Sequence, residues 1–378
     1  MIRTVVIAVV VALAVVIALA AIFGVFAQSR KPAPIEGFAA PFVFGRFQIP
    51  ESNPLTIEAV ELGRRLFYDP RLSGDNTVSC STCHKQHLAF TDGLKTGLGI
   101  SGKPLAFNSM SLANLLWGPR HFFWDGRAAS LEEQALIPVQ HADEMAQNLD
   151  LLVVELEDDS RYRELFDIAY GEISASSIGR ALAAFERTLV SSNSRYDQFL
   201  RGDLTLSAEE ELGRKLFMAH PDVKVSLRGG NCIDCHSQFL TGGFSSRYDG
   251  FSNNGLDEEQ HLPPGLAQTT GDQAHRGLFK VPTLRNIAVT APYMHDGRFS
   301  TLDEVLDHYN EGIRWSSTLS PLIMEADNLN KESPDHISLN LGEGEQTAII
   351  AFLHTLTDHD FLTAEKISDP FVQNGQQR

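Results

Sequence analysis

A five-residue pattern, Cys-x-x-Cys-His, occurs twice in this chain and accounts for all four of its cysteines. The two copies are Cys80, Cys83 and His84, and Cys232, Cys235 and His236. Two thiols at this spacing reach the two vinyl groups of one haem, and the adjacent histidine offers a proximal nitrogen to its iron. Zinc sites also use paired cysteines, but no further cysteine remains to complete one. The pattern therefore predicts two covalently bound c-type haems and leaves no cysteine for a disulfide.

Four short blocks also occur twice, in the same order, which indicates an internal duplication. The paired blocks are 61–67 with 211–217, 111–114 with 283–286, 124–127 with 295–298, and 184–189 with 351–356. Helical spacing of apolar residues predominates, and strand-like alternation does not stand out. We therefore predict an all-α fold of two tandem cytochrome c-like haem domains, preceded by an N-terminal apolar segment.

The expected organisation begins with this apolar segment at 1–31 and a linker at 32–54 that is rich in Pro, Gly and Phe. An N-terminal haem domain is then expected at 55–200, a C-terminal haem domain at 201–365 and a tail at 366–378. Other expected elements are closing helices at 183–190 and 347–356, a connection at 191–205, and a loop at 242–277 over the second haem.

Two capping boxes predict matching helices in the two halves. Ser130 with Glu133 begins a helix that should stop near Pro138. Thr301 with Glu304 begins the second helix. Its apolar face is formed by Leu302, Val305, Leu306 and Tyr309.

The duplication aligns Tyr309 of the second half with Pro138 of the first. A phenol oxygen can ligate haem iron, whereas a proline side chain has no donor atom. We therefore expect one closed haem and one open haem. A buried tyrosine whose hydroxyl only forms a hydrogen bond would fit the same pattern.

Residues near Pro138 become candidates for chemistry at an open iron. A carboxylate such as Glu144 can take the proton from the inner oxygen of peroxide and return it to the outer one, and the amide of Gln134 can orient the peroxide. His141 is a further candidate. Trp124 is oxidisable enough to relay an electron between two cofactors. Each of these residues could instead have no catalytic role. Glu144 would then be a solvated carboxylate at a helix start, and Trp124 an aromatic residue of the core.

An uncharged apolar run at 4–27 follows Arg3 at the N-terminus. The run is long enough for a membrane anchor, which needs ~20 residues, and it exceeds the ~7–15 residues of a signal-peptide core. Its end also suits cleavage after Ala27. We expect an anchor, with a cleaved signal as the alternative, and either one places the folded body in the periplasm.

The formal net charge of −17 argues against a nucleic-acid partner, because no basic run is present to neutralise phosphates. The same charge favours encounter with a basic partner, such as a small electron-carrier protein.

The combined motifs resemble the bacterial di-haem cytochrome c peroxidase family, which includes the MauG enzymes of methylamine utilisation. Besides the two haem motifs, the resemblance is carried by blocks 123–127, 131–134, 144–145, 281–286 and 291–297. It covers about residues 55–360. The resemblance implies a peroxide-reducing enzyme with Gln134 and Glu144 in the distal pocket of the first haem. It also implies that Trp124 lies between the haems and that the second haem transfers electrons.

The resemblance further implies a calcium ion between the haems. Its ligands would be the side chain of Asn108 and the carbonyl oxygens of Thr290 and Pro292, and oxygen ligands of this type suit calcium. The electron source would be a small donor protein, either a cytochrome c or a cupredoxin, or else a protein substrate.

Two departures from the family pattern are informative. Members that need reductive activation have a blocking histidine in the loop before Asn108, where this chain has Ile, Ser and Gly at 100–102, so its first haem should be open. They also have a methionine ligand on the second haem, where this chain has Tyr309, as in MauG-type enzymes. A phenolate stabilises ferric and higher states. The sequence therefore favours a MauG-like peroxidase over the alternative, a di-haem electron-transfer protein without catalysis.

Overall fold

The computed structural model describes residues 33, 35, 41, 44, 45, 47–118, 121–222, 227–240, 250–327 and 337–372. Within these ranges no helix is both long and apolar enough to cross a membrane. The apolar run at 4–27, predicted as an anchor or a signal, lies outside the described residues.

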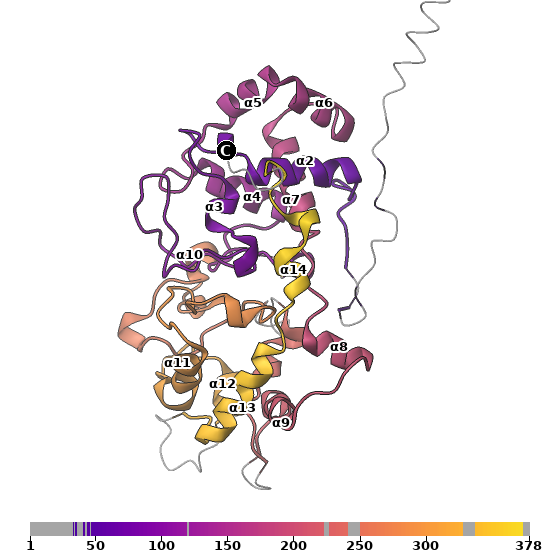
Figure 1. The fold of residues 1–378 in the computed structure, drawn as a ribbon. Helices are drawn as coiled ribbons and strands as arrows, with labels where there is room; N and C mark the ends of the chain where they lie inside the picture. Colours follow the sequence, from indigo (N-terminus) through magenta and orange to yellow (C-terminus); the bar gives the residue numbers. More distant parts are fainter. Residues whose placement is uncertain are drawn as a thin grey trace, which may run out of the picture.

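The described chain is mostly helical and forms two lobes (Figure 1). The first lobe contains α2 (Ile57–Tyr68), α3 (Cys80–Cys83), α4 (Leu131–Gln140), α5 (Leu149–Asp158), α6 (Ser160–Ala169) and α7 (Ala175–Glu186). The second contains α8 (Arg195–Arg201), α9 (Ala208–Met218), α10 (Ala267–Thr270), α11 (Leu302–Asp307), α12 (Pro321–Glu325) and α13 (Glu343–His354). Short 3₁₀ turns occur at Pro70–Leu72, Gln86–Leu88, Leu115–Trp117, Cys232–Asp234, Ser237–Phe239, Glu259–His261, Gln273–His275, Ile287–Val289 and Glu365–Ile367.

Each lobe is built on one close helix pair, α2 with α7 in the first lobe and α9 with α13 in the second. Gly63 of α2 lies so near α7 that a Cβ atom would be 1.9 Å from the carbonyl oxygen of Ala181. Gly213 of α9 has the same relation to α13, where its Cβ would be 1.8 Å from the carbonyl oxygen of Ala348. The two glycines are equivalent in the repeated sequence blocks, so the lobes share one packing contact.

The apolar cores repeat in the same way. Phe67 and Phe185 lie in the first core with ring centroids 5.2 Å apart. Phe217 and Phe352, at the equivalent positions, lie in the second core with ring centroids 5.6 Å apart. Each buried aromatic ring stabilises its lobe by roughly 1.5–3 kcal/mol through removal of apolar surface from water.

The predicted start of α4 at Ser130 is confirmed, and the helix ends at Gln140, within two residues of the predicted end near Pro138. Ser130 accepts a hydrogen bond from the amide of Glu133 (3.1 Å). The helix then continues past Pro138. The proline removes only its own N–H donor, and the next turn still closes because the amide of His141 donates to the carbonyl oxygen of Ile137 (3.0 Å).

The capping box at Thr301 and Glu304 is confirmed at the start of α11. A π-helical turn (His308–Gly312) follows directly and carries Tyr309, which packs against the core of the second lobe. The predicted inward direction of Tyr309 is therefore confirmed.

Other predicted segments are present, with shifted bounds or with additional elements. The closing helices, expected at 183–190 and 347–356, are α7 and α13, which begin and end earlier. The connection at 191–205 contains α8. The predicted loop at 242–277 contains α10, a strand and 3₁₀ turns in its described part.

The fold is not purely helical, because β1 (Phe251–Ser252) pairs antiparallel with β2 (Phe279–Lys280). Strands of two residues are too short for alternation to be visible in a sequence. The ladder also joins the lobes, since the amide of Lys280 donates to the carbonyl oxygen of Trp124 (3.0 Å).

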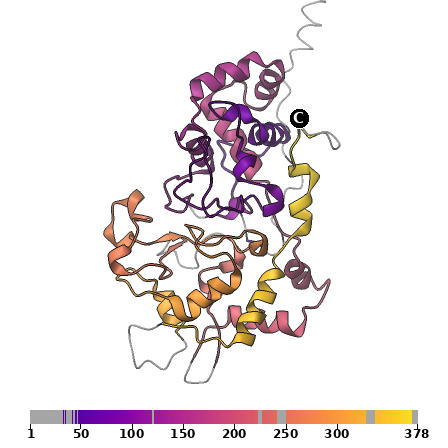
Figure 2. The ribbon, with the colours of Figure 1, turned by 60° about the vertical axis from the view of Figure 1, so that its left-hand side comes forward.

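The last α-helix, α14 (His359–Thr363), lies beside the first lobe in both views (Figures 1 and 2). The ring of Phe361 packs on that of Phe90, with centroids 5.6 Å apart. Arg64 of α2 donates from Nε to the carbonyl oxygen of Ser368 (2.7 Å). The predicted second domain at 201–365 with a tail at 366–378 does not anticipate this return to the first core.

Replacing Gly213 with Ala is expected to destabilise the protein by about 1–3 kcal/mol or more, because the new methyl group would overlap the backbone of α13. Gly344→Ala on α13 is the matched control. No atom lies within 4 Å of its Cβ position, so alanine there should stabilise by about 0.5–1 kcal/mol. Urea unfolding of the haem-loaded variants measures both effects. Equal effects of the two substitutions would contradict the close contact.

Candidate active site

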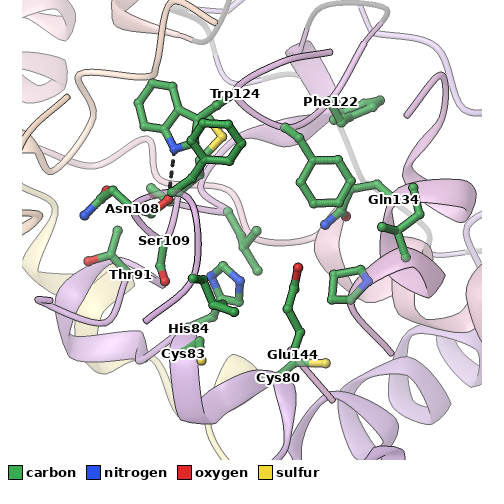
Figure 3. Close-up of a pocket in the computed structure, with 18 of the residues that line it drawn as sticks. Cys80, Cys83, His84, Thr91, Asn108, Ser109, Phe122, Trp124, Gln134 and Glu144 are labelled. Atoms are coloured by element: carbon green, nitrogen blue, oxygen red, sulfur yellow. Dashed lines mark hydrogen bonds between the residues drawn. The ribbon is translucent and has the colours of Figure 1, made fainter. Parts of the chain in front are cut away.

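A cavity of about 830 Å³ lies beside the first Cys-x-x-Cys-His motif (Figure 3). Cys80 and Cys83 belong to α3, His84 follows directly, and all three line the cavity. Figure 3 shows the two cysteines at one end of this space and Phe122 and Trp124 at the other. The volume is suitable for a large ligand, because ligand sites typically enclose ~300–1,000 Å³.

The ring of His84 is oriented by a hydrogen bond between its Nδ1 and the carbonyl oxygen of Phe90 (2.7 Å). Because a carbonyl oxygen can only accept, Nδ1 carries the proton and Nε2 retains its lone pair. Burial lowers the pKa of His84, which keeps the imidazole neutral, as metal ligation requires.

The donor set and the lining of this cavity fit haem c. Burial raises the pKa of the Cys80 thiol and raises that of Cys83 to about 11, so a thiolate is disfavoured at both positions. If both sulfur atoms form thioether bonds to haem vinyl groups, they are uncharged and their burial carries no such cost. Two buried oxygens on lining residues, Gln134 Oε1 and Glu186 Oε2, have no hydrogen-bond partner in the described protein. Unpaired polar atoms of this kind indicate that a further group completes the site.

The residues predicted for the distal pocket are brought together on this cavity. Glu144, Gln134 and Pro138 all line it, and Figure 3 shows Glu144 and Gln134 projecting toward the space beside His84. Burial raises the pKa of Glu144 above its ordinary value, and nearby positive groups reduce that shift. His141 lies close by, with Nδ1 3.8 Å from Glu144 Oε1.

The segment that carries Glu144 is held by a neighbouring loop. The amide of Ile100 donates to the carbonyl oxygen of Glu144 (2.7 Å). A Cβ atom on Gly99 would lie 1.5 Å from the carbonyl oxygen of Asp143, so only glycine permits this approach. Residues 100–102 do not line the cavity.

The second motif borders a smaller cavity of about 190 Å³, lined by Cys232, Cys235, His236 and Tyr309. This volume is below the usual range for ligand sites. The indication of a second haem therefore comes from the two cysteines and the histidine that line the cavity. Nδ1 of His236 lies 3.2 Å from the carbonyl oxygen of Pro282. Burial lowers the pKa of His236 to about 4, which leaves Nε2 as a neutral donor.

Tyr309 lines the second cavity, and its aligned residue Pro138 lines the first. The hydroxyl of Tyr309 accepts a hydrogen bond from Nδ2 of Asn254 (3.1 Å). Burial raises the pKa of this phenol, so it is protonated unless a cation binds its oxygen. The π-helical turn at this position is a local irregularity of the kind that is frequent at functional sites.

Trp124 lies between the two sites and lines both cavities. Its Nε1 donates to the carbonyl oxygen of Asn108 (2.8 Å), drawn as the dashed line in Figure 3. The ring of His295, its counterpart in the repeat, lies 6.5 Å from it and stacks on Phe279 at 3.6 Å. The repeated Trp124 and His295 positions therefore meet at the junction of the lobes.

The residues predicted for calcium, Asn108, Thr290 and Pro292, all line the first cavity. Nδ2 of Asn108 donates to the carbonyl oxygen of Leu94 (2.9 Å), which leaves Oδ1 as the side-chain ligand atom. Among the described residues no cluster of three His, Cys, Asp or Glu side chains could hold a metal ion. The donors here are amide and carbonyl oxygens, which are ligands of the type that calcium accepts.

Two buried ionisable residues at the cavities, Glu186 and Lys280, were not predicted from the sequence. Glu186 is 5% exposed, and burial raises its pKa to about 8. It follows Leu182 by one turn of α7, and both line the first cavity. Lys280 is 3% exposed and lines both cavities. Their burial could have been suspected from the sequence, because Glu186 lies on the apolar face of a helix and Lys280 lies inside the apolar run at 278–281.

The fold and the two sites define a mostly helical c-type protein with two haem sites, one of which has acid–base side chains beside it. The sequence profile of the family described as di-haem cytochrome c peroxidase matches residues 57–205. The chain is 38% identical over 311 residues to the methylamine utilization protein MauG of Methylorubrum extorquens, covering 81% of this chain and 80% of that protein. It is 33% identical over 315 residues to the cytochrome c551 peroxidase of Nitrosomonas europaea, covering 81% of each.

Solved structures agree with these sequence matches. A MauG-like protein associated with microbial copper homeostasis has a TM-score of 0.77 at 34% identity, covering 89% of this chain and 99% of that chain. The diheme peroxidase BthA of Burkholderia thailandensis shares the fold, with a TM-score of 0.65 at 21% identity over 86% of this chain and 91% of that chain. The chain therefore belongs to the di-haem cytochrome c peroxidase family, as its motifs predicted, and is a peroxidase-type haem oxidoreductase with haem c cofactors.

Proposed function

We propose that this protein reduces hydrogen peroxide at the first cavity with electrons that arrive through the second. The observation that carries the proposal is the asymmetry between the two cavities. The first is lined by Pro138, which has no donor atom, together with Glu144 and Gln134, whereas the second is lined by Tyr309. A site without a second protein ligand leaves a coordination position for peroxide.

Haem bound through Cys80 and Cys83 would supply the iron that exchanges electrons with peroxide. Ionised Glu144 accepts the proton from the near oxygen of peroxide and returns it to the far oxygen, so that the O–O bond breaks with water as the leaving group. Each turnover takes two electrons from the donor and two protons from solvent and yields two water molecules. The raised pKa of Glu144 strengthens it as a base.

Gln134 supports the same reaction by orientation. Its Oε1 is buried and lacks a partner, so it can accept a hydrogen bond from the peroxide O–H group. A peroxide held by Gln134 would present its proton to Glu144, which lines the same cavity.

At the second cavity, we propose that Tyr309 and His236 would hold the iron of a haem attached to Cys232 and Cys235. Binding to a ferric ion would offset the burial that raises the pKa of this phenol. A phenolate lowers the reduction potential relative to a thioether, because it stabilises the more oxidised states. Trp124, which lines both cavities, is the electron bridge between the two sites.

The matched packing contacts of the lobes support an origin by internal duplication, with one haem domain in each lobe. The shared lining by Asn108, Thr290 and Pro292 supports a calcium ion near Trp124. The acid–base step at Glu144 requires neither the duplication nor the calcium ion.

The electron source is proposed to be a small donor protein, a cytochrome c or a cupredoxin, which the net charge of −17 would attract if its surface is basic. A second candidate function is oxidation of residues in a partner protein. It is favoured by Tyr309 in place of a methionine ligand. Because haem is attached to c-type motifs outside the cytoplasm, we place the folded body in the periplasm, exported or held by residues 4–27.

Glu144→Gln should slow peroxide reduction by a reduced small cytochrome about 10²–10⁴-fold, because an amide cannot carry the proton. The unsubstituted protein should lose activity as pH falls through the Glu144 pKa, since only the ionised carboxylate is a base. Burial places that loss above the ~4.3 of an ordinary glutamate. Rate–pH profiles measure this.

The matched control is Asp143→Asn, because the neighbouring carboxylate contributes to the raised pKa of Glu144. This variant should keep the maximal rate and move the acid limb to lower pH. An unchanged rate in Glu144→Gln would reject the acid–base role and make His141 the next candidate. Absence of turnover in the unsubstituted protein would favour the electron-transfer alternative.

Tyr309→Met should raise the reduction potential of the second haem and give the spectrum of a low-spin His/Met haem, because a neutral thioether replaces an anionic oxygen. A spectroelectrochemical titration measures both changes. Identical potentials and spectra in the two proteins would show that Tyr309 only packs in the core.

Trp124→Phe should slow electron transfer between the two sites and leave the initial reaction with peroxide close to its normal rate. The matched control is Trp117→Phe, because Trp117 lines neither cavity. Stopped-flow spectra after peroxide addition separate the two steps. The bridge assignment fails if both variants behave alike.

A further inference from the structure

Lys280 is a buried cation that has no counter-ion among the described residues. Its side chain is 3% exposed, and no described residue accepts a hydrogen bond from its Nζ or forms an ion pair with it. The nearest charge-stabilising contact is the face of the Phe122 ring, whose centroid lies 4.9 Å from Nζ. A ring face alone compensates only a small part of the cost of burying an ammonium group.

The amine faces the first cavity, although Lys280 touches both. Consecutive residues of a strand point to opposite faces, so Phe279 and Lys280 of β2 diverge. Phe279 lines the second cavity and stacks on His295. Phe122, the ring beneath Nζ, lines only the first cavity.

The amine also lies at the end of the cavity away from the cysteines. The backbone of Lys280 bonds to Trp124, and its Nζ lies over Phe122. Figure 3 shows Trp124 and Phe122 across the cavity from Cys80 and Cys83. In haem the two propionates extend from the porphyrin edge away from the vinyl groups. Thioether bonds at the cysteines therefore direct the propionates toward the Lys280 end.

We propose that Nζ of Lys280 pairs with a propionate carboxylate of the haem in the first cavity. The inference rests on haem attachment at Cys80 and Cys83 and does not depend on the peroxide chemistry of the proposed function. It gives a buried ammonium and a buried carboxylate the partners that each requires.

The other cations that line this cavity are already accounted for. Arg127 is paired with Asp125 (2.8 Å) and lies over the ring of Phe123, with its guanidinium carbon 3.7 Å from the centroid. Lys103 is exposed to solvent. In the protein alone, burial lowers the pKa of Lys280 to about 7, and an adjacent carboxylate reverses that shift because it favours the ammonium form.

A buried positive charge beside a haem favours the reduced state, which carries one positive charge fewer. Lys280 therefore raises the reduction potential of the first haem and acts as a positioning residue for it. An exposed charge at the same distance has a weaker effect because solvent screens it.

The test is a spectroelectrochemical titration of the haem-loaded Lys280→Met, Lys280→Arg and Lys103→Met proteins. Lys280→Met should lower the midpoint potential of the first haem more than that of the second. Lys280→Arg should retain most of the potential, and Lys103→Met should match the unsubstituted protein. An unchanged first-haem potential in Lys280→Met overturns the proposal. The pyridine haemochrome assay confirms two haems per chain, which separates this result from a failure of haem attachment.

A second measurement needs no substitution. The redox-difference infrared spectrum of the unsubstituted protein, prepared with haem labelled with ¹³C at the propionate carboxyls, reports their protonation. Pairing with Lys280 predicts that the first-haem propionate near it is an ionised carboxylate in both redox states. A protonated carboxylic acid on both propionates of that haem would overturn the proposal even if the Lys280→Met protein does not fold.

Discussion

Both sites depend on the hydrogen bond that ties each motif histidine to a backbone carbonyl oxygen, from Phe90 for His84 and from Pro282 for His236. Fixing Nδ1 directs Nε2 along one line and so determines the plane in which a haem can lie and which side chains face its other side. The accepting carbonyls belong to loops outside the motifs. Phe90 has a φ of 62°, a left-handed conformation that is unfavourable for a bulky residue. The surrounding packing must therefore hold this loop in place. The orientation of the His84 ring depends on that packing, because the carbonyl oxygen of Phe90 fixes Nδ1.

The two lobes share their helix pairs and aromatic cores and differ at the positions that face the haem sites. Pro138 and Tyr309 are one such pair, and Trp124 and His295 are another. The helix contacts at Gly63 and Gly213 leave no room for variation, because even one methyl group would overlap a backbone carbonyl. The cavity positions are free of this constraint. A repeated scaffold can therefore hold two haems at fixed positions while their ligands, and hence their chemistry, diverge.

The sequence predicted what short-range patterns encode: the haem motifs, the helix starts at Ser130 and Thr301, and the inward direction of Tyr309. It also singled out Gln134 and Glu144, which line the same cavity. It did not predict the two-residue strands, because no periodicity exists at that length. The burial of Lys280 and the docking of α14 depend on surfaces distant in sequence. A pattern along the chain carries no information about which distant surface will cover it.

The return of α14 to the first lobe has a consequence for the order of maturation. Export and synthesis deliver the first haem motif well before the C-terminus, and domains generally fold as they emerge. Phe361, however, covers Phe90, whose carbonyl oxygen orients His84. The lobe that is synthesised first is therefore completed last, because the loop that orients His84 gains its contact with Phe361 only when the whole chain has been delivered. A chain that stopped after the second motif would have both attachment sites but would lack the contact of Phe361 with Phe90.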